Sequence, residues 1–197
     1  TIWAFYTIAV ACTHLYERLI GMDLLAINGE GELYAPHGVT DTPQYAPGVS
    51  SSPEVSNATG MLPLTERQRA MVRVSSHTEG REGFYALDGT LTTFWRPADD
   101  DETPVMTVNL QAPYLVGAAR IIWRDIGLDY DGGAVPGPIR FILEGRPDND
   151  IDKWITLVDA SDNDTELHVD YREIKPVSCE SVRLRICGHP EGLRPGV

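Results

Sequence analysis

The segment Ala86–Trp95, with the sequence ALDGTLTTFW, constrains the fold of this chain more than any other segment. Asp88 and Gly89 form a turn signal, because glycine accepts a positive φ and aspartate hydrogen-bonds the nearby backbone. The carboxylate, the threonine hydroxyls and the free carbonyls of such a turn are hard oxygen ligands of the kind that Ca²⁺ prefers. Trp95 follows directly and suits the end of an apolar core. The segment therefore predicts a turn beside a core, with donors suited to calcium.

On both sides of this segment, short runs of Val, Ile, Leu and aromatic residues alternate with clusters of turn residues. This pattern is typical of an all-β sandwich. No long amphipathic helix is evident, and we expect at most one short helical turn within residues 64–74. The stretch Tyr45–Pro53, rich in proline, serine and glycine, predicts a linker or an irregular segment. The sequence thus predicts two parts, residues 1–49 with the linker and a β-sandwich over residues 50–197.

The charge of the chain excludes two classes of partner. The 197 residues carry a formal net charge of -13 at pH 7. Such a chain repels nucleic-acid phosphates and anionic membranes, whereas neutral sugars are compatible with it. No run approaches the roughly 20 apolar residues that a membrane-spanning helix needs. The apolar run Ile2–Val10 is too short, and neither a basic leader nor a cleavage pattern is evident.

The chain has three cysteines, Cys12, Cys179 and Cys187. Cys179 and Cys187 flank one strand-like run, which would separate them by roughly 27 Å in a straight strand. The Cα atoms of a disulfide must lie within about 7 Å of each other. We therefore predict no bridge between Cys179 and Cys187. No spacing of cysteine and histidine is typical of a zinc site.

Over the range 72–187 the order of strand-like runs resembles the discoidin-like family, also called coagulation factor five/eight type C domains or family 32-like carbohydrate-binding modules. The segment Ala86–Trp95 looks like the characteristic loop of that family. Val105–Leu110 is similar to its "aromatic-x-x-Val-Asp-Leu-Gly" strand, although Asn109 stands for the aspartate and Gln111 for the glycine. Later strands of the family are matched by Val116–Trp123, Ile139–Gly145, Trp154–Val158 and Val182–Ile186. The resemblance implies a jelly-roll β-sandwich.

Many bacterial members of this family are sugar-binding modules of glycosidases, so the resemblance implies carbohydrate as a partner. Sugars bind such modules on loops at one end of the sandwich, where an aromatic ring stacks on a pyranose and polar side chains bond its hydroxyls. The candidate sugar-binding residues are Trp95, Arg96, Asp125, Tyr130, Asp131, Arg146 and His189. The alternative is that Trp95 and Trp154 belong to the core, since both match core or near-core positions of the family. The acidic run 99–102 is expected to be a solvated loop.

The resemblance also implies a structural Ca²⁺ ion at the turn, with Asp88, Thr90, Thr93 and backbone carbonyls as ligands. The alternative is a turn that Asp88 shapes without any metal. A glutamate from the last strand usually completes the family's site, but this chain stops at Gly196–Val197, where that strand would begin. We therefore expect the sheet to lack one strand, which would leave an unpaired edge and an incomplete metal site.

The first part of the chain resembles the last blade of the five-bladed propeller in family 43-like glycoside hydrolases. Ile2–Val10 is a buried-type strand, and Asn28-Gly29 favours a tight hairpin. Tyr16–Asp23 and Asn28–Leu33 are similar to strand motifs of that blade. The segment amounts to about one blade, which is too small to bury a core alone.

The sequence leaves the enzymatic role of the chain uncertain. Glycoside hydrolysis needs two facing carboxyl groups, which come from earlier blades in the family 43 pattern. Glu17 is better explained as a structural ion pair with Arg18. Where many members carry a metal-coordinating histidine, this chain has Thr7 or a neighbour, and the nearest histidine is His14. We assign no catalytic residue and expect no hydrolysis from this chain alone.

Two hypotheses for function follow. In the first, the chain is the C-terminal part of a family 43-like glycosidase, extracellular or periplasmic, whose sandwich binds plant or microbial polysaccharide or supports the propeller. In the second, the sandwich is a scaffold or interaction domain without sugar binding. A lipid-binding role would need exposed apolar spikes and basic residues, against which the acidic composition argues.

Overall fold

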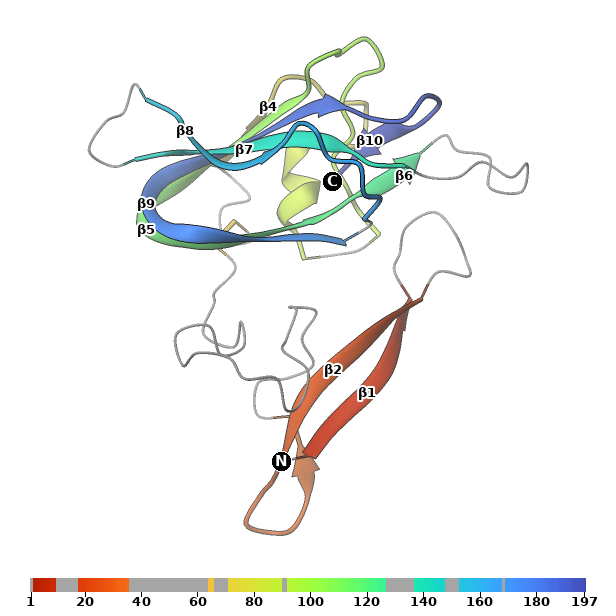
Figure 1. Ribbon diagram of the computed structural model, residues 1–197, viewed down its shortest axis with the longest axis vertical. Helices are drawn as coiled ribbons and strands as arrows, with labels where there is room; N and C mark the ends of the chain where they lie inside the picture. The colour runs from red at the N-terminus through yellow and green to blue at the C-terminus, as the bar shows by residue number, and fades with distance from the viewer. Residues whose placement is uncertain are drawn as a thin grey trace. The chain divides into compact units, whose positions relative to one another are not determined.

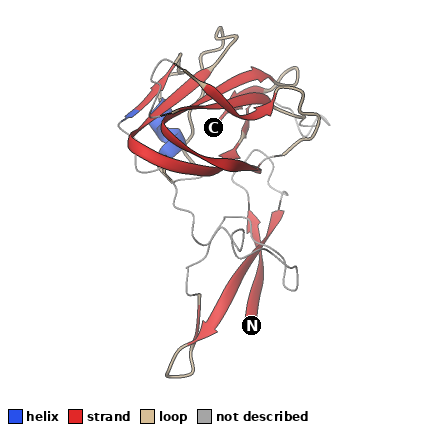
Figure 2. Cartoon of the chain, turned by 60° about the vertical axis from the view of Figure 1, so that its left-hand side comes forward, coloured by secondary structure: helices blue, strands red, loops and turns tan. Residues whose placement is uncertain are grey.

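The computed structural model describes residues 2–9, 18–35, 64–65, 71–89, 92–126, 137–147, 153–167 and 169–197. The chain divides into two compact units, Thr1–Val10 with Leu15–Leu62, and Ala11–His14 with Pro63–Val197. Within the described residues both units are built of strands, and helix is confined to the second unit (Figure 2). The all-β class predicted from the sequence is confirmed. The predicted boundary between residues 49 and 50 lies outside the described residues and stays a prediction.

The first unit contains a three-stranded antiparallel sheet in the order β1-β2-β3, whose strands are Ile2–Ala9, Arg18–Ile27 and Leu33–Tyr34. The β2–β3 hairpin differs from the tight Asn28-Gly29 turn that we predicted, because its loop runs over residues 28–32. The Asn28 side-chain oxygen accepts the amide protons of Glu30 and Glu32, at 3.0 and 2.8 Å. Gly31, not Gly29, takes the positive φ, of 87°. A side chain that binds two amides thus shapes the longer loop.

The second unit contains a five-stranded antiparallel sheet in the order β4-β5-β9-β7-β8 and a two-stranded antiparallel pair, β10-β6 (Figure 1). A short 3₁₀ helix, η3, spans Gly83–Leu87. The strands are β4 Val72–Val74, β5 Val105–Ile122, β6 Arg124–Ile126, β7 Arg140–Arg146, β8 Ile155–Ala160, β9 Val169–Gly188 and β10 Arg194–Gly196. Within the range 64–74, where at most one short helical turn was expected, Met71 has 3₁₀ conformation and Val72–Val74 form strand β4. Residues 66–70 lie outside the described chain, so the extent of the turn stays a prediction.

Strands β5 and β9 are long enough to take part in both layers of the sandwich. They pair from Val105↔Arg185 to Ile122↔Val169, and their register shifts between Asn109 and Tyr114. Gln111 in this interval has a φ of 67°. Bulges of this kind bend strands, and Figure 1 shows both strands curving at the left of the second unit. The runs expected as separate strands over 105–110 and 116–123 are therefore one bent strand.

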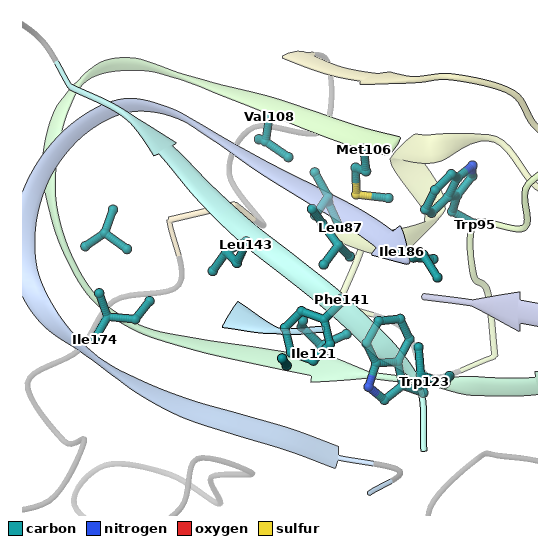
Figure 3. Close-up of a cluster of buried hydrophobic side chains, with 14 of the residues drawn as sticks. Leu87, Trp95, Met106, Val108, Ile121, Trp123, Phe141, Leu143, Ile174 and Ile186 are labelled. Atoms are coloured by element: carbon teal, nitrogen blue, oxygen red, sulfur yellow. The ribbon is translucent and has the colours of Figure 1, made fainter. Parts of the chain in front are cut away.

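The core lies between the two layers that this bend creates (Figure 3). Alternate residues of β5, Met106, Val108 and Leu110, are buried, as expected for a strand with one face on a core. The rings of Trp123 and Phe141 lie 5.4 Å apart at an interplanar angle of 56°. Burying each large apolar side chain contributes roughly 1.5–3 kcal/mol, so this cluster is the main source of stability.

Strand β10 ties the end of the chain to the sandwich. Arg194–Gly196 pairs with β6, and Val197 exchanges two backbone hydrogen bonds with Trp95, of 2.7 and 3.0 Å. The prediction that one further strand is lacking stays a prediction.

Cys179 is a buried free thiol and Cys187 an exposed one, so the prediction that they form no bridge is confirmed. No helix within the described ranges is long and apolar enough to cross a membrane.

Candidate functional site

Side chains from three distant segments meet around Phe94, near the β6–β10 pair. Phe94 is only 8% exposed. The guanidinium carbon of Arg81 lies 4.0 Å from the centre of its ring, and that of Arg124 lies 5.1 Å away. Cation–π contacts at this distance are worth about 0.5–1 kcal/mol each at an accessible site. Arg124 is also the β6 residue that pairs with Gly196 of β10. These contacts thus hold Arg81 and Arg124 beside the paired strands β6 and β10.

Two further arginines share one carboxylate at the same end of the sandwich. Arg96 Nη2 contacts Asp99 Oδ1 at 2.5 Å, and Arg194 of β10 binds the other carboxylate oxygen. The hydrogen bond from Arg194 lowers the pKa of Asp99; desolvation opposes this shift, and the nearby charges of Arg96 and Arg194 add to it. The carboxylate therefore stays ionised and links the loop of residues 96–99 to β10.

Asp101 anchors the same loop to the chain that follows β4. The hydroxyls of Ser75 and Ser76 both donate to its Oδ2 at 2.5 Å, and the amide of Thr103 donates to Oδ1 at 3.1 Å. Burial raises the pKa of Asp101, but these hydrogen bonds outweigh it and hold the pKa below its ordinary value. The run 99–102 was expected to be a solvated loop. Asp99, Asp100 and Glu102 are exposed, as expected, and Asp99 and Asp101 also form structural contacts.

The predicted calcium turn follows η3 directly. Thr93 Oγ1 donates to Asp88 Oδ2 at 2.6 Å, and Gly89 has a φ of 72°, which glycine adopts readily. Carboxylate and hydroxyl oxygens suit Ca²⁺, which takes 6–8 oxygen ligands. Among the described residues no three His, Cys, Asp or Glu side chains gather into a metal site, so backbone carbonyls would have to supply most ligands. Thr90 lies outside the described residues, and the calcium site stays a prediction.

The structure places Trp95 in the core. The side chain has 0% exposure, and its indole N–H donates to the carbonyl of Ser76 at 2.9 Å. A ring with no exposed face cannot stack on a sugar, so we leave Trp95 out of the site. The core position of Trp95 agrees with the alternative that the sequence left open.

The remaining candidate residues do not form one cluster. Arg96 lies at the β6–β10 end of the sandwich. The backbone of Asp125 pairs with Pro195 at the same end, and the side chain of Asp125 lies outside the described part of the structure. His189 is exposed and immediately precedes the turn into β10. Tyr130 and Asp131 lie outside the described residues.

Arg146 belongs to the other end of the sheet. Strand β7 begins with Arg140, opposite Gly188, and it ends with Arg146, opposite Ser181. At about 3.3 Å per residue the two ends of this strand are about 20 Å apart. A single sugar site at the β6–β10 end therefore does not include Arg146.

Sequence reasoning missed four residues at the β6–β10 end, and they include both arginines over Phe94. These residues are Arg81, Phe94, Arg124 and Arg194. They are far apart in the sequence and follow no common spacing. Their proximity depends on the pairing of β10 with β6, which no local pattern indicates.

Comparison with known proteins supports the fold alone. No family model and no curated protein matches this chain. Among solved structures, chitosan-binding module 2 of a chitosanase/glucanase from Paenibacillus sp. IK-5, in complex with chitotriose, is 16% identical with a TM-score of 0.51, covering 64% of this chain and 88% of that one. The module CpGH89CBM32-6 from Clostridium perfringens is 17% identical with a TM-score of 0.51, covering 67% and 94%. The family 32 module of NanJ from C. perfringens, in complex with galactose, is 13% identical with a TM-score of 0.50, covering 66% and 91%. The chain thus shares the β-sandwich fold of carbohydrate-binding modules, as the discoidin-like resemblance predicted.

Proposed function

We propose that the second unit binds carbohydrate through the loops at the β6–β10 end of its sandwich. The observation that carries this proposal is the likeness of its fold to modules solved with chitotriose and with galactose. The net charge of -13 is compatible with neutral sugars. We expect such a module to act outside the cytoplasm, in an extracellular or periplasmic setting.

The residues at this end provide the chemistry that sugar binding needs. Guanidinium groups donate several hydrogen bonds in a fixed plane, which suits neighbouring sugar hydroxyls. Arg194 has an exposed side chain, and Arg124 is half-buried. We also assign Asp125, Tyr130, Asp131 and His189 to this site as candidates, because in the sequence they belong to β6, follow it within five residues, or precede β10. Tyr130 would supply the aromatic face that Trp95 does not.

Calorimetric titration with chitotriose and galactose tests this proposal. Charged hydrogen bonds are worth about 1.5–3 kcal/mol, so Arg124→Ala should weaken binding by at least about tenfold. Lys175→Ala, which removes one exposed positive charge from β9, is the matched control and should bind as the wild type does. If a correctly folded wild-type chain binds no neutral sugar, the scaffold hypothesis replaces this one.

We further propose that the first unit is the last propeller blade of a family 43-like glycosidase that releases arabinose-, xylose- or galactose-type sugars. Its strands expose large apolar side chains, among them Phe5 at 62%, Ile27 at 58% and Leu33 at 58%. Exposed apolar surface of this kind is typical of a protein contact. Because the catalytic carboxylates would belong to other blades, the purified chain should release no nitrophenol from aryl glycosides of these sugars. Release by this chain would contradict the proposal.

We also propose that the turn at Asp88 binds calcium through the Asp88 carboxylate, the Thr93 hydroxyl and backbone carbonyls, with Thr90 as a further candidate ligand. A ligand that binds only the folded state raises the melting temperature. Calcium should therefore raise the melting temperature of the wild type and leave that of Asp88→Ala unchanged. The exposed Asp162→Ala is the control and should keep the calcium response. An equal response of all three proteins would show that the ion binds elsewhere.

A further inference from the structure

The five-stranded sheet carries a group of arginines on the face turned away from the core, which we call the arginine face. It comprises Arg73 of β4, Arg146 of β7, and Arg183 and Arg185 of β9. Side chains alternate between the two faces of a strand. Leu184 and Ile186 of β9 are buried in the core, so their neighbours Arg183 and Arg185 point the other way.

Strand register brings these side chains into adjacent rows. Arg73 pairs with Thr107, Thr107 with Arg183, and Arg183 with Glu144. In the next row Arg146 lies opposite Ser181. Neighbouring strands are about 4.8 Å apart, so the row from Arg73 to Glu144 spans roughly 15 Å. These strands are neighbours in the sheet in the order β4-β5-β9-β7.

Among the described residues of this face positive charge exceeds negative charge, although the net charge of the chain is -13. Glu144, only 8% exposed, contacts Arg183 at 2.7 Å and Arg185 at 3.8 Å, so one carboxylate serves two cations. Arg73 and Arg146 form no ion pair with any described carboxylate. A second described carboxylate on the face is Asp159, opposite Ile142, which accepts a hydrogen bond from the Ser161 hydroxyl at 2.6 Å.

Arg146 has donor capacity that the described residues do not use. Its Nη2 donates to the hydroxyl of Ser181 at 2.9 Å. Its Nε is shielded from solvent and has no hydrogen-bond partner among the residues that the structure describes. Buried polar atoms are nearly always paired, so an unpaired guanidinium nitrogen calls for a physical explanation. The other N–H groups of this guanidinium remain available to an anionic ligand.

Trp154 adds an aromatic ring to the arginine face. The guanidinium carbon of Arg183 lies 4.2 Å from the centre of its ring, and that of Arg146 lies 5.8 Å away. The indole is half-buried, so part of it is accessible. Stacked guanidinium groups hold the ring in place. An aromatic surface between fixed cations suits a ligand that has both an apolar ring face and negative charge.

From this arrangement we infer that the arginine face binds an acidic polysaccharide, one whose pyranose units carry carboxylates. Guanidinium groups bind carboxylates in bidentate geometry, and an indole packs against the apolar face of a pyranose. Because Arg146 lies about 20 Å along β7 from the β6–β10 end, this site is distinct from the proposed site for neutral sugars. A single chain would then hold a charged and an uncharged glycan on separate surfaces.

Titration of the full chain with polygalacturonate at low and moderate salt tests this inference. The wild type should bind, and added salt should weaken binding because exposed charges are screened. The variant Arg146→Gln/Arg185→Gln should lose at least tenfold in affinity for polygalacturonate and keep its binding of chitotriose or galactose. Arg124→Ala should do the reverse. Circular dichroism checks that each variant is folded, and the single variant Arg185→Gln provides a milder change at an exposed side chain.

The results of these titrations decide whether the arginine face binds an acidic polysaccharide. The inference is overturned if the folded wild type does not bind polygalacturonate at low salt, or if the double variant binds it as tightly as the wild type. It is also overturned if single-stranded DNA of matched charge binds more tightly than polygalacturonate, because the face would then bind polyphosphates. Loss of neutral-sugar binding alone would count against the proposed function and leave this inference standing.

Discussion

Trp95 connects three parts of the second unit through one residue. Its ring is completely buried, its indole N–H bonds the carbonyl of Ser76, and its backbone exchanges two hydrogen bonds with Val197. The sequence indicated that a tryptophan after the Asp-Gly turn would close a core. It also allowed a sugar-stacking role, because local sequence does not determine which face of a ring is covered. The covering strands come from distant segments.

We predict that Trp95→Phe destabilises the protein by roughly 1–3 kcal/mol, because the partly buried carbonyl of Ser76 loses its donor. Denaturation by urea, followed by circular dichroism, measures this change. Tyr114→Phe, at a side chain that is 42% exposed, is the control and should alter stability by less than about 0.5 kcal/mol. Equal effects of the two variants would contradict the structural role of Trp95.

Asp101 makes stability depend on pH. Its folded-state pKa lies below the ordinary value of 3.8, so folding favours the ionised carboxylate. The resulting stability is complete well above that ordinary value, and it is lost as pH falls through 3.8 toward the lower folded-state pKa. We predict that Asp101→Asn lowers the free energy of unfolding at pH 7 by about 1–2 kcal/mol. The difference from wild type should shrink as pH falls below about 4.

Urea denaturation at several pH values measures the contribution of Asp101. The exposed neighbour Asp100 provides the control, since Asp100→Asn should leave both the stability and its pH dependence nearly unchanged. A difference between Asp101→Asn and wild type that stays constant down to pH 2 would show that ionisation of this carboxyl is not the cause.

At the scale of elements, β7, β8 and β9 pack closely because β7 has a glycine at the contact. A Cβ atom at Gly145 would lie 2.5 Å from Cys179 Sγ and 3.0 Å from a methyl group of Leu157. These distances are too short for any unshifted side chain. The buried thiol of Cys179 therefore acts as a small core residue rather than as a partner for a disulfide.

We predict that Gly145→Ala destabilises the protein by about 1–3 kcal/mol through overpacking. Gly188→Ala is the control, because the nearest atom to its new methyl group would be Arg140 Cδ, at an ordinary 3.6 Å. Adding Cys179→Ala to Gly145→Ala should recover part of the loss, since it removes the closest atom. Thermal denaturation distinguishes these cases, and equal losses in the two glycine variants would refute the packing argument.

The sequence predicted the positions of most strands but not their continuity. Alternation in Val105–Leu110 and the apolar runs at Ile139–Gly145 and Trp154–Val158 correspond to parts of β5, β7 and β8. The joining of the two runs of β5 was missed, because a bulge around Gln111 depends on the partner strand β9. Likewise only the run between Cys179 and Cys187 was predicted of the long strand β9, which spans Val169–Gly188.

For the molecule as a whole, the fold class could be predicted and the candidate site only in part. The order of the strand motifs along the chain was sufficient to predict the β-sandwich. Arg96 and Arg146 were candidates for one sugar site, but the register of β7 separates Arg146 from the β6–β10 end, where Arg96 lies. Surface charge shows the same limit, since a net charge of -13 gives no hint that arginines gather on one face of a sheet.

The central claim is that this chain binds carbohydrate through its sandwich, and a glycan-array screen with and without Ca²⁺ tests it most directly. We predict binding to at least one neutral glycan, and weaker binding of that glycan by Arg124→Ala and Tyr130→Ala. Binding that also weakens without Ca²⁺ and in Asp88→Ala would support the proposed metal turn. A chain that is folded by circular dichroism and binds no glycan on the array would contradict the claim and leave a scaffold as its function.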